Sequence, residues 1–149
     1  MAVRRVINKQ LGELLLERGI ISQIQLDQAL EIQHSKGGLI GEILVELGFA
    51  KEEDIAQSLT AQYGFPYLPL NNYEVNPEIT GIIPGRVARQ YLLVPIDKIG
   101  NNLTLAMSNP LNVPAIEDVE LLSGCSVQTF VSTSSDIKKA IERYYKDKE

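Results

Sequence analysis

The sequence predicts an α+β fold, in which an all-helical tandem repeat is followed by a small α+β domain with a short sheet flanked by helices. Two observations predict it. Segment 10–33 recurs as 39–62, and the pattern that follows has the order helix, β-hairpin, helix, strand, helix. We therefore expect the tandem helical repeat in residues 1–63 and the α+β subdomain in residues 64–149.

The repeat consists of matched residues at an offset of 29 positions. Gly12 of the first copy matches Gly41 of the second, and Gly19 matches Gly48. Eight of the 24 aligned pairs are identical, and seven more exchange one apolar residue for another. Such agreement indicates that both copies form the same structural unit.

Each copy is predicted to form two helices separated by a glycine. In the first copy, leucines at a spacing near 3.6 residues precede Gly19, a residue suited to the left-handed end of a helix. Ser22 and Gln25 then form a capping box for the second helix, with Ile21 as a hydrophobic staple. In the second copy Lys51 replaces the serine, and three acidic residues in the first turn complement the helix dipole instead.

Gly12 and Gly41 lie near the start of a helix, where no cap requires glycine and where it costs roughly 1 kcal/mol relative to alanine. One interpretation is a plain helical repeat with a shared core. The other is that each glycine lets another group approach the backbone closely. Because exposed N–H groups at a helix start suit an anion, two such positions predict a ligand with two anionic groups.

The second half alternates helix and strand signals. Residues 65–70 contain two prolines, which indicates a connector or an edge strand. In the last helix, Ile137, Ala140, Ile141 and Tyr144 form the expected buried stripe. The remaining patterns predict a short helix that starts at Pro77, a helix over 85–91, strands over 92–96 and 103–107 joined by a turn at Asn101 and Asn102, a helix from Pro114 to Leu122 that ends at Gly124, a strand over 126–131, and a last helix capped by Ser135 or Asp136.

Composition excludes several classes of function. A net charge of −5 argues against general binding to DNA or RNA. The longest apolar stretches are far shorter than the roughly 20 residues of a membrane helix, so we expect a cytoplasmic location and no membrane insertion. Cys125 and His34 are single residues of their types, which excludes a structural zinc site and a disulfide framework. We expect Cys125 beside a strand and His34 in a solvated loop.

The chain contains no phosphate-binding loop of the Gly-x-x-x-x-Gly-Lys type and no sequence motif of zinc proteases, serine hydrolases or dithiol oxidoreductases. We expect Asp118 and Glu120 to lie on a solvated helix face and not to act as a catalytic pair. The prediction is therefore a protein that is not an enzyme, with no catalytic residues, no metal ligands and no cofactor.

The repeat resembles the MshEN family, the N-terminal regulatory domain of type II secretion and type IV pilus assembly ATPases. The family repeat is Arg-Leu-Gly, two free positions, two aliphatics, two free, Gly, two aliphatics, four free, Leu, three free, Leu, two free and Gln. The glycines, the terminal glutamines and nearly all the aliphatics recur here in both copies. The stretch 102–111 also looks like the family, which usually reads Ala-Met-x-Asp-Pro-Leu-Asp at this point. Asn109 and Asn112 replace the two aspartates, and for this segment we favour a strand-to-helix turn.

The resemblance implies a regulatory module that binds cyclic di-GMP. Each repeat is expected to hold one half of the dinucleotide through aliphatic contacts, backbone donors near the Leu-Gly step and the terminal glutamine, whose amide can both donate to and accept from a guanine edge. The implied residues are Leu11, Gly12, Leu15, Leu26, Leu30 and Gln33 in the first copy, Ile40, Gly41, Leu44, Ile55, Leu59 and Gln62 in the second, and Gln10 and Leu39 at the heads of the copies.

The heads of both copies depart from the family, because Gln10 and Leu39 stand where the family has arginine. Losing a charged hydrogen bond costs about 1.5–3 kcal/mol. Arg4, Arg5 and Lys9 are the basic residues near the first copy that offer partial compensation. The alternative function is a docking module of the same systems that has lost nucleotide binding.

In either case the expected partner is an ATPase motor domain or an inner-membrane platform protein. The sequence is compatible with a stand-alone protein and with part of a longer ATPase. It is also compatible with the secretion system and with the pilus system.

Overall fold

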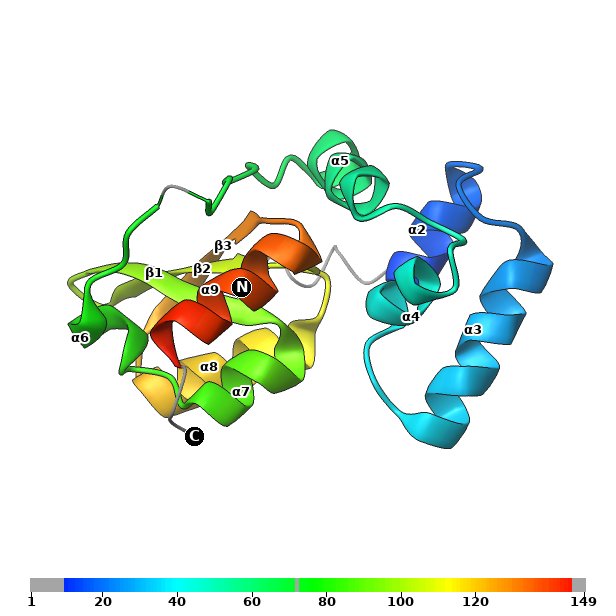
Figure 1. Cartoon of the computed structure of the whole chain (residues 1–149). Helices are drawn as coiled ribbons and strands as arrows, with labels where there is room; N and C mark the ends of the chain where they lie inside the picture. Colours follow the sequence, from blue (N-terminus) through cyan, green and yellow to red (C-terminus); the bar gives the residue numbers. More distant parts are fainter. Residues whose placement is uncertain (1–9, 72, 146–149) are drawn as a thin grey trace.

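The structure, a computed structural model, describes residues 10–71 and 73–145. The fold is α+β, as predicted, and a helical part formed by residues 11–63 lies beside a three-stranded sheet with its own helices (Figure 1). Among the described helices, none is both long and apolar enough to cross a lipid bilayer.

Each copy of the repeat forms two helices, which confirms the prediction. They are α2 (Leu11–Glu17), α3 (Gln23–Lys36), α4 (Ile40–Glu46) and α5 (Glu52–Tyr63). The first helix of each copy is followed by a left-handed glycine, Gly19 with φ +75° and Gly48 with φ +78°. The N–H of Ile20 donates to the carbonyl of Leu15 at 3.0 Å, and the same bond recurs 29 positions later. Both copies therefore end their first helix with the same hydrogen-bonded glycine turn.

The second helices of the copies begin differently. Before α3, the Ser22 hydroxyl accepts the Gln25 N–H and the Ser22 N–H donates to the Gln25 side chain, which confirms the capping box. Before α5, Lys51 supplies no side-chain cap. The expectation of a loop for His34 was wrong: this exposed residue lies in the last turn of α3, because the chain leaves the helix only at Gly37.

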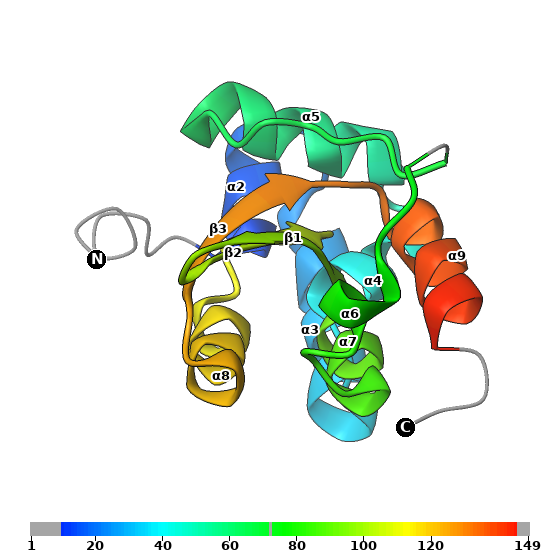
Figure 2. The ribbon, with the colours of Figure 1, turned by 90° about the vertical axis from the view of Figure 1, so that its left-hand side faces the viewer.

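The four helices of the repeat enclose one hydrophobic core. Its fully or nearly buried members are Leu11, Leu14, Leu15, Ile21, Leu26, Ala29, Ile43, Leu44, Ala50, Ile55, Ala56 and Leu59. Val131, the last residue of strand β3 (Ser126–Val131), belongs to the same core. Figure 2 shows why, since α5 lies beside β3. The repeat and the sheet therefore share buried apolar surface.

After α5 the chain runs extended along the edge of β3. Tyr67 forms a single parallel bridge with Val131, and the Val131 N–H donates to the carbonyl of Pro66 at 2.8 Å. The segment predicted as a connector or an edge strand therefore combines both roles. Two short helices follow with the predicted start and bounds, α6 (Pro77–Thr80) and α7 (Gly85–Tyr91).

The sheet has the order β1-β2-β3. β1 (Leu93–Ile99) and β2 (Asn102–Met107) form the predicted antiparallel hairpin, although β1 runs three residues past the expected end and Asn102, expected in the turn, begins β2. It begins one residue late because Leu92 caps α7 in a left-handed conformation with φ +53°. β3 pairs with β2 in parallel, so the chain crosses over through α8 (Val113–Ser123), which ends at Gly124 as predicted.

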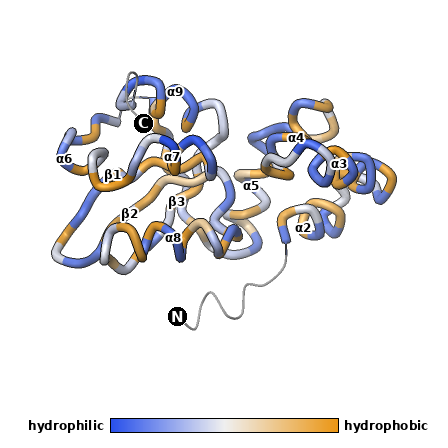
Figure 3. Tube along the Cα trace, turned by 90° about the horizontal axis from the view of Figure 1, so that it is seen from below, coloured by the Kyte–Doolittle hydropathy of each residue, from blue (hydrophilic) through white to orange (hydrophobic). Residues whose placement is uncertain are grey.

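Helices cover both faces of the sheet. On one face, Val94 and Ile96 of β1 pack with Ile137, Ala140 and Ile141 of α9 (Ser134–Tyr144). These three α9 residues form the predicted buried stripe, whereas Tyr144 is half-buried. The other face packs against α8, through the buried residues Leu103, Leu105, Met107, Ala115, Ile116 and Val119. Figure 3 shows hydrophobic residues along the strands and within the repeat helices alike.

Two expectations about this half were wrong. The N-cap of α9 is Thr133, whose hydroxyl accepts the Asp136 N–H, so α9 begins before Ser135. Asp118 and Glu120 are half-buried and not solvated. Asp118 accepts the Tyr91 hydroxyl and Glu120 accepts the Val127 N–H, so both carboxylates tie α8 to its neighbours.

Candidate functional site

A pocket of about 350 Å³ lies between the repeat and the sheet. Its volume falls within the usual range for small-molecule sites. On the repeat side it is lined by Gln10, Leu11, Gln33, Leu39, Ile40, Gly41, Glu42, Glu52 and Ile55. On the other side it is lined by Tyr91, Ser108, Asn109, Leu111, Asn112, Pro114, Ser132, Thr133 and Ser134.

The heads of both repeat copies open onto this one pocket. Gln10 is the residue before α2 and Leu39 is the residue before α4, and both line it. Leu11, Ile40 and the half-buried Gly41 continue the same wall. Two positions that are 29 residues apart in the sequence therefore face the same space.

Of the predicted ligand-binding residues, one half borders the pocket and the other half does not. Those at the pocket are Gln10, Leu11, Gln33, Leu39, Ile40, Gly41 and Ile55. Gly12, Leu15, Leu26, Leu44 and Leu59 are buried in the core of the repeat. Leu30 and Gln62 are exposed and lie outside this pocket.

The two repeated glycines have different surroundings. A Cβ atom on Gly12 would lie 2.7 Å from Cδ1 of Leu26, so the group that approaches this backbone is a side chain of α3. A Cβ atom on Gly41 would lie 3.0 Å from Cδ2 of Leu11. Internal packing therefore accounts for Gly12, whereas Gly41 both packs closely and borders the pocket.

Gln33 also has a structural role. Its Nε2 atom donates to the carbonyl oxygen of Gly38 at 3.0 Å, within the turn that joins the two copies. Gln62, its counterpart in the second copy, is exposed at the end of α5. The symmetry of the sequence is therefore broken at the two terminal glutamines.

The opposite wall comes from two loops that follow neighbouring parallel strands. Residues 108–112 follow β2, and residues 132–134 follow β3. Ligands of α/β sheets commonly bind outside the carboxyl ends of parallel strands, where such loops meet. Sequence reasoning missed this wall. The helix between the two strands was the available signal, because it implies a parallel pair whose exit loops lie at one edge.

Asn109 and Asn112 hold the first of these loops in shape. The side-chain oxygen of Asn109 accepts the Leu111 N–H at 3.1 Å, and that of Asn112 accepts the Ala115 N–H at the start of α8. This confirms the predicted strand-to-helix turn. An amide oxygen accepts these bonds as a carboxylate does, so asparagine keeps the turn without adding negative charge to the pocket wall.

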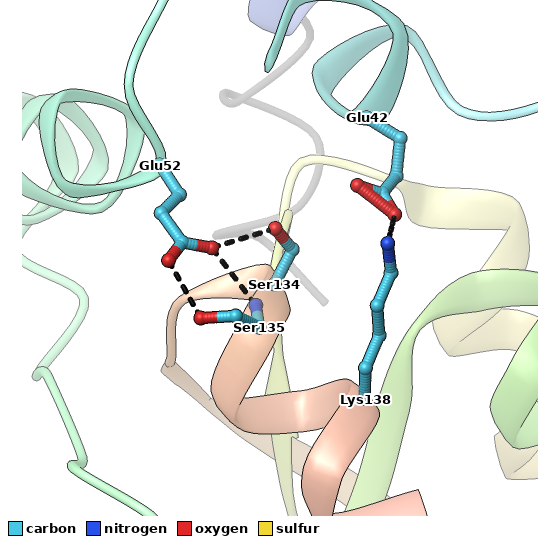
Figure 4. Close-up of polar contacts among 5 residues, drawn as sticks. All are labelled: Glu42, Glu52, Ser134, Ser135 and Lys138. Carbon is cyan, nitrogen blue, oxygen red and sulfur yellow. Dashed lines mark hydrogen bonds and ion pairs between the residues drawn. The ribbon is translucent and has the colours of Figure 1, made fainter. Parts of the chain in front are cut away.

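Two carboxylates of copy two stand at the pocket wall and bind α9 (Figure 4). Glu52 Oε1 accepts the Ser134 hydroxyl at 2.9 Å and the Ser135 N–H at 2.8 Å, and Oε2 accepts the Ser135 hydroxyl at 2.6 Å. Glu42 forms an ion pair with Lys138. Burial alone would raise the pKa of Glu52, but the hydrogen bonds from both serines and the charge of Lys138 hold that pKa below its usual value.

The described lining residues include no lysine, arginine or histidine. Arg4, Arg5 and Lys9, the basic residues expected to help the first copy, lie outside the described residues. Tyr91 donates its hydroxyl to Asp118, and this bond together with burial raises the pKa of the phenol.

The wall therefore combines aliphatic, amide and hydroxyl groups with the carboxylates of Glu42 and Glu52. It suits a flat polar ring whose edge both donates and accepts hydrogen bonds.

The chain is similar in sequence to known proteins of one family. The sequence profile of the MshEN domain matches residues 63–149. The type IV pilus assembly ATPase PilB of Myxococcus xanthus is 39% identical over 139 residues, and that of Thermus thermophilus is 31% identical over 147 residues. The type II secretion system protein E of Xanthomonas campestris is 28% identical over 147 residues. These matches cover 93%, 97% and 95% of this chain but only 25%, 16% and 26% of the relatives.

Two solved structures share the fold. The N-terminal domain of XpsE superimposes with a TM-score of 0.74 at 28% identity, covering 91% of this chain and 93% of that one. A structure described as MshE with cdg superimposes with a TM-score of 0.66 at 30% identity, covering 92% and 99%. The likeness to the XpsE domain indicates an N-terminal region and not an ATPase motor, in agreement with the prediction that the chain is not an enzyme.

Proposed function

Because this chain belongs to the MshEN domain family, we propose that it is a cyclic di-GMP-sensing regulatory module of a type IV pilus or type II secretion system. The observation that carries the proposal is the meeting of both repeat heads, Gln10 and Leu39, at one pocket. Further support comes from the similar structure of MshE with cdg, the abbreviation of cyclic di-GMP.

In this proposal the repeat side of the pocket holds the ligand. Leu11, Ile40 and Ile55 offer aliphatic surface to a guanine face, and Gln33 offers its amide to the guanine edge. Gly41 leaves the backbone open to the ligand, because it carries no Cβ.

The buried members of the expected set then act indirectly. Leu15, Leu26, Leu44 and Leu59 support the helices that carry the contacting residues, and Gly12 makes room for Leu26. Leu30 and Gln62 contact a ligand only if it extends beyond this pocket.

We further propose that the module acts in the cytoplasm and transmits ligand binding to an ATPase motor domain or to an inner-membrane platform protein. A second function is a docking module without nucleotide binding. One observation favours it: Glu42 and Glu52 border the pocket while neither head residue is basic, so the described wall offers a dianion little charge complementarity.

Isothermal titration of the whole chain with cyclic di-GMP tests the first function. We expect heat of binding at ligand concentrations on the order of tens of micromolar. Gln33→Ala should weaken binding about fivefold or more, as expected for a lost hydrogen bond. The matched control is Gln57→Ala, which changes an exposed glutamine of α5 outside the pocket.

Gln62→Ala distinguishes two binding geometries. No effect is expected if the pocket is the site, whereas a loss equal to that of Gln33→Ala indicates a symmetric site on the repeat. The absence of any heat would reject the sensing function. Capture of a platform protein that does not respond to the nucleotide would then favour the docking module.

A further inference from the structure

Copy two of the repeat is attached to α9 at two separate points. One is the Glu52 carboxylate with the hydroxyls of Ser134 and Ser135 and the Ser135 N–H, and the other is the ion pair between Glu42 and Lys138 (Figure 4). Residues 134 and 138 are one helical turn apart, so both points lie on one face of α9. Two points fix the rotation of the repeat against α9 as well as its distance.

Neither α9 nor α5 needs this connection to stabilise its own N-terminal end. α9 already has its own N-cap, because the Thr133 hydroxyl accepts the Asp136 N–H. Glu52 and Glu53 both supply negative charge to the first turn of α5, and only Glu52 is bound to α9. The contact of Glu52 therefore serves to join the two parts of the molecule.

The two points differ in strength. Three donors surround the half-buried Glu52 carboxylate, and hydrogen bonds to a charged group are stronger than those between neutral groups. The side chain of Lys138 is 52% exposed, so solvent screens its attraction to Glu42. Glu52 is therefore the stronger of the two points.

The attachment also forms part of the pocket, since Glu42, Glu52 and Ser134 line it. An anionic ligand that enters the pocket therefore competes with the Glu52 carboxylate for the hydroxyl of Ser134, which lines the same pocket. A ligand that binds better to the detached form shifts the population toward that form.

We propose that Glu42 and Glu52 form a latch with Ser134, Ser135 and Lys138, which holds the repeat against α9, and that an anionic ligand of the pocket opens it. The latch itself is independent of the proposed function, whereas its opening by cyclic di-GMP rests on that function. Opening changes the orientation of the repeat relative to the sheet, and this is the movement that a partner would detect.

Distance measurement by pulsed electron paramagnetic resonance tests the latch without ligand. Spin labels are attached at Gln28→Cys on α3 and Glu117→Cys on α8, two exposed positions, while Cys125 is buried. The parent should give one narrow distribution. Glu52→Gln should add a broad, displaced component, with the ratio of open to closed chains raised roughly tenfold or more.

Glu53→Gln is the matched control, because it removes the same charge from the same turn of α5 without touching α9. Lys138→Met breaks the weaker point and should raise the ratio by only about two- to fivefold. Ser135→Ala removes one hydrogen-bond donor to Glu52 and keeps the N-cap of α9. It is therefore the replacement test variant if Glu52→Gln does not fold. The latch would be overturned if the distance distribution of Glu52→Gln coincided with that of the parent. The same holds for Ser135→Ala if that variant is used instead.

Addition of cyclic di-GMP tests the coupling. Saturating ligand should displace the parent distribution toward the open form, and Glu52→Gln should bind the ligand roughly tenfold more tightly. Binding that leaves the distances unchanged would overturn the coupling. If no variant binds the nucleotide, the proposed function fails, and the ligand-free comparison still decides whether the latch exists.

Discussion

Leu26 of α3 packs so closely over Gly12 of α2 that a Cβ atom at position 12 would lie 2.7 Å from its Cδ1 atom. In the second copy, Ile55 is the counterpart of Leu26, and the corresponding distance from Gly41 is 3.8 Å. The first helix of each copy thus carries its glycine where the second helix crosses it. This contact explains a helical glycine through packing inside the repeat.

Gly12→Ala is expected to destabilise the chain. Overpacking a core costs typically 1–3 kcal/mol, and the gain in helix propensity of up to about 1 kcal/mol offsets only part of it. Urea unfolding should therefore show a loss of about 1 kcal/mol. On a Leu26→Ala background the overlap is absent, so the same substitution should become neutral or stabilising. Equal losses on both backgrounds would contradict the packing explanation.

Gly41→Ala should separate stability from ligand binding. The added Cβ meets the end of the Leu11 side chain at 3.0 Å and reaches Ile55 only at an ordinary van der Waals distance of 3.8 Å, so the stability should change by less than about 1 kcal/mol. Gly41 borders the pocket, whereas Gly12 does not. We expect Gly41→Ala to weaken cyclic di-GMP binding about tenfold, as is usual when one ligand contact is lost. Titration of both alanine variants, with their unfolding curves, measures the two effects independently.

Arginines at the repeat heads should strengthen nucleotide binding. Gln10 and Leu39 line the pocket at the positions where the family has arginine. A charged, planar donor there should contribute about 1.5 kcal/mol or more per site, which is roughly tenfold in affinity. Gln10→Arg and Leu39→Arg should each show this gain by calorimetry. A matching pair of lysine variants controls for charge alone, and no gain in any of them would argue for the docking module.

The contribution of Glu52 to stability should depend on pH. Its pKa is lower in the folded chain than the ordinary value of 4.5, because the hydrogen bonds from Ser135 and Ser134 outweigh the effect of burial. A lowered folded pKa means that the stabilisation is present above about pH 4.5 and disappears as the pH falls through the lower, folded pKa.

Unfolding of the parent and of Glu52→Gln in urea from pH 7 to pH 3 measures this contribution. The parent should be more stable by about 1–2 kcal/mol near neutral pH, and the difference should shrink below about pH 4.5. The other carboxylates titrate in both proteins, so their contributions cancel in the difference between the two unfolding free energies. A difference that stays constant down to pH 3 would show that the carboxylate charge is not responsible.

Tyr145 should stabilise the end of α9 through a buried hydrogen bond. Its hydroxyl donates to the carbonyl oxygen of Thr80 at 2.6 Å, and burial raises the pKa of the phenol well above its usual range. Tyr145→Phe should cost about 1–3 kcal/mol, because the carbonyl loses its donor.

The raised pKa of Tyr145 adds a test in alkali. Folding favours the neutral phenol, so the stabilisation is present below the ordinary pKa of 10.0 and declines as the pH rises above it. The parent should therefore lose stability above pH 10 faster than Tyr145→Phe does, as measured by unfolding in urea.

Local signals in the sequence were sufficient to predict most helices and strands of the fold. Gly19 and Gly48 end their helices, Ser22 starts α3, and Gly124 ends α8, all as predicted. Each of these choices depends on the φ angle or the hydrogen bonds of a few neighbouring residues, so it can be read without knowledge of the rest of the chain. The clearest failure was the start of α9, where Thr133, Ser134 and Ser135 are adjacent candidates for one cap.

The site was only half predictable. The heads of the repeat were found because the same pattern occurs twice, but the loops at 108–112 and 132–134 face them only after β2 and β3 pair in parallel. The partners of Glu52 are 82 and 83 residues away. Sequence periodicity thus determined which helices and strands form, because those depend on neighbours along the chain. Tertiary packing alone decided which repeated residues stay buried and which reach the pocket, because burial depends on segments that are distant in sequence.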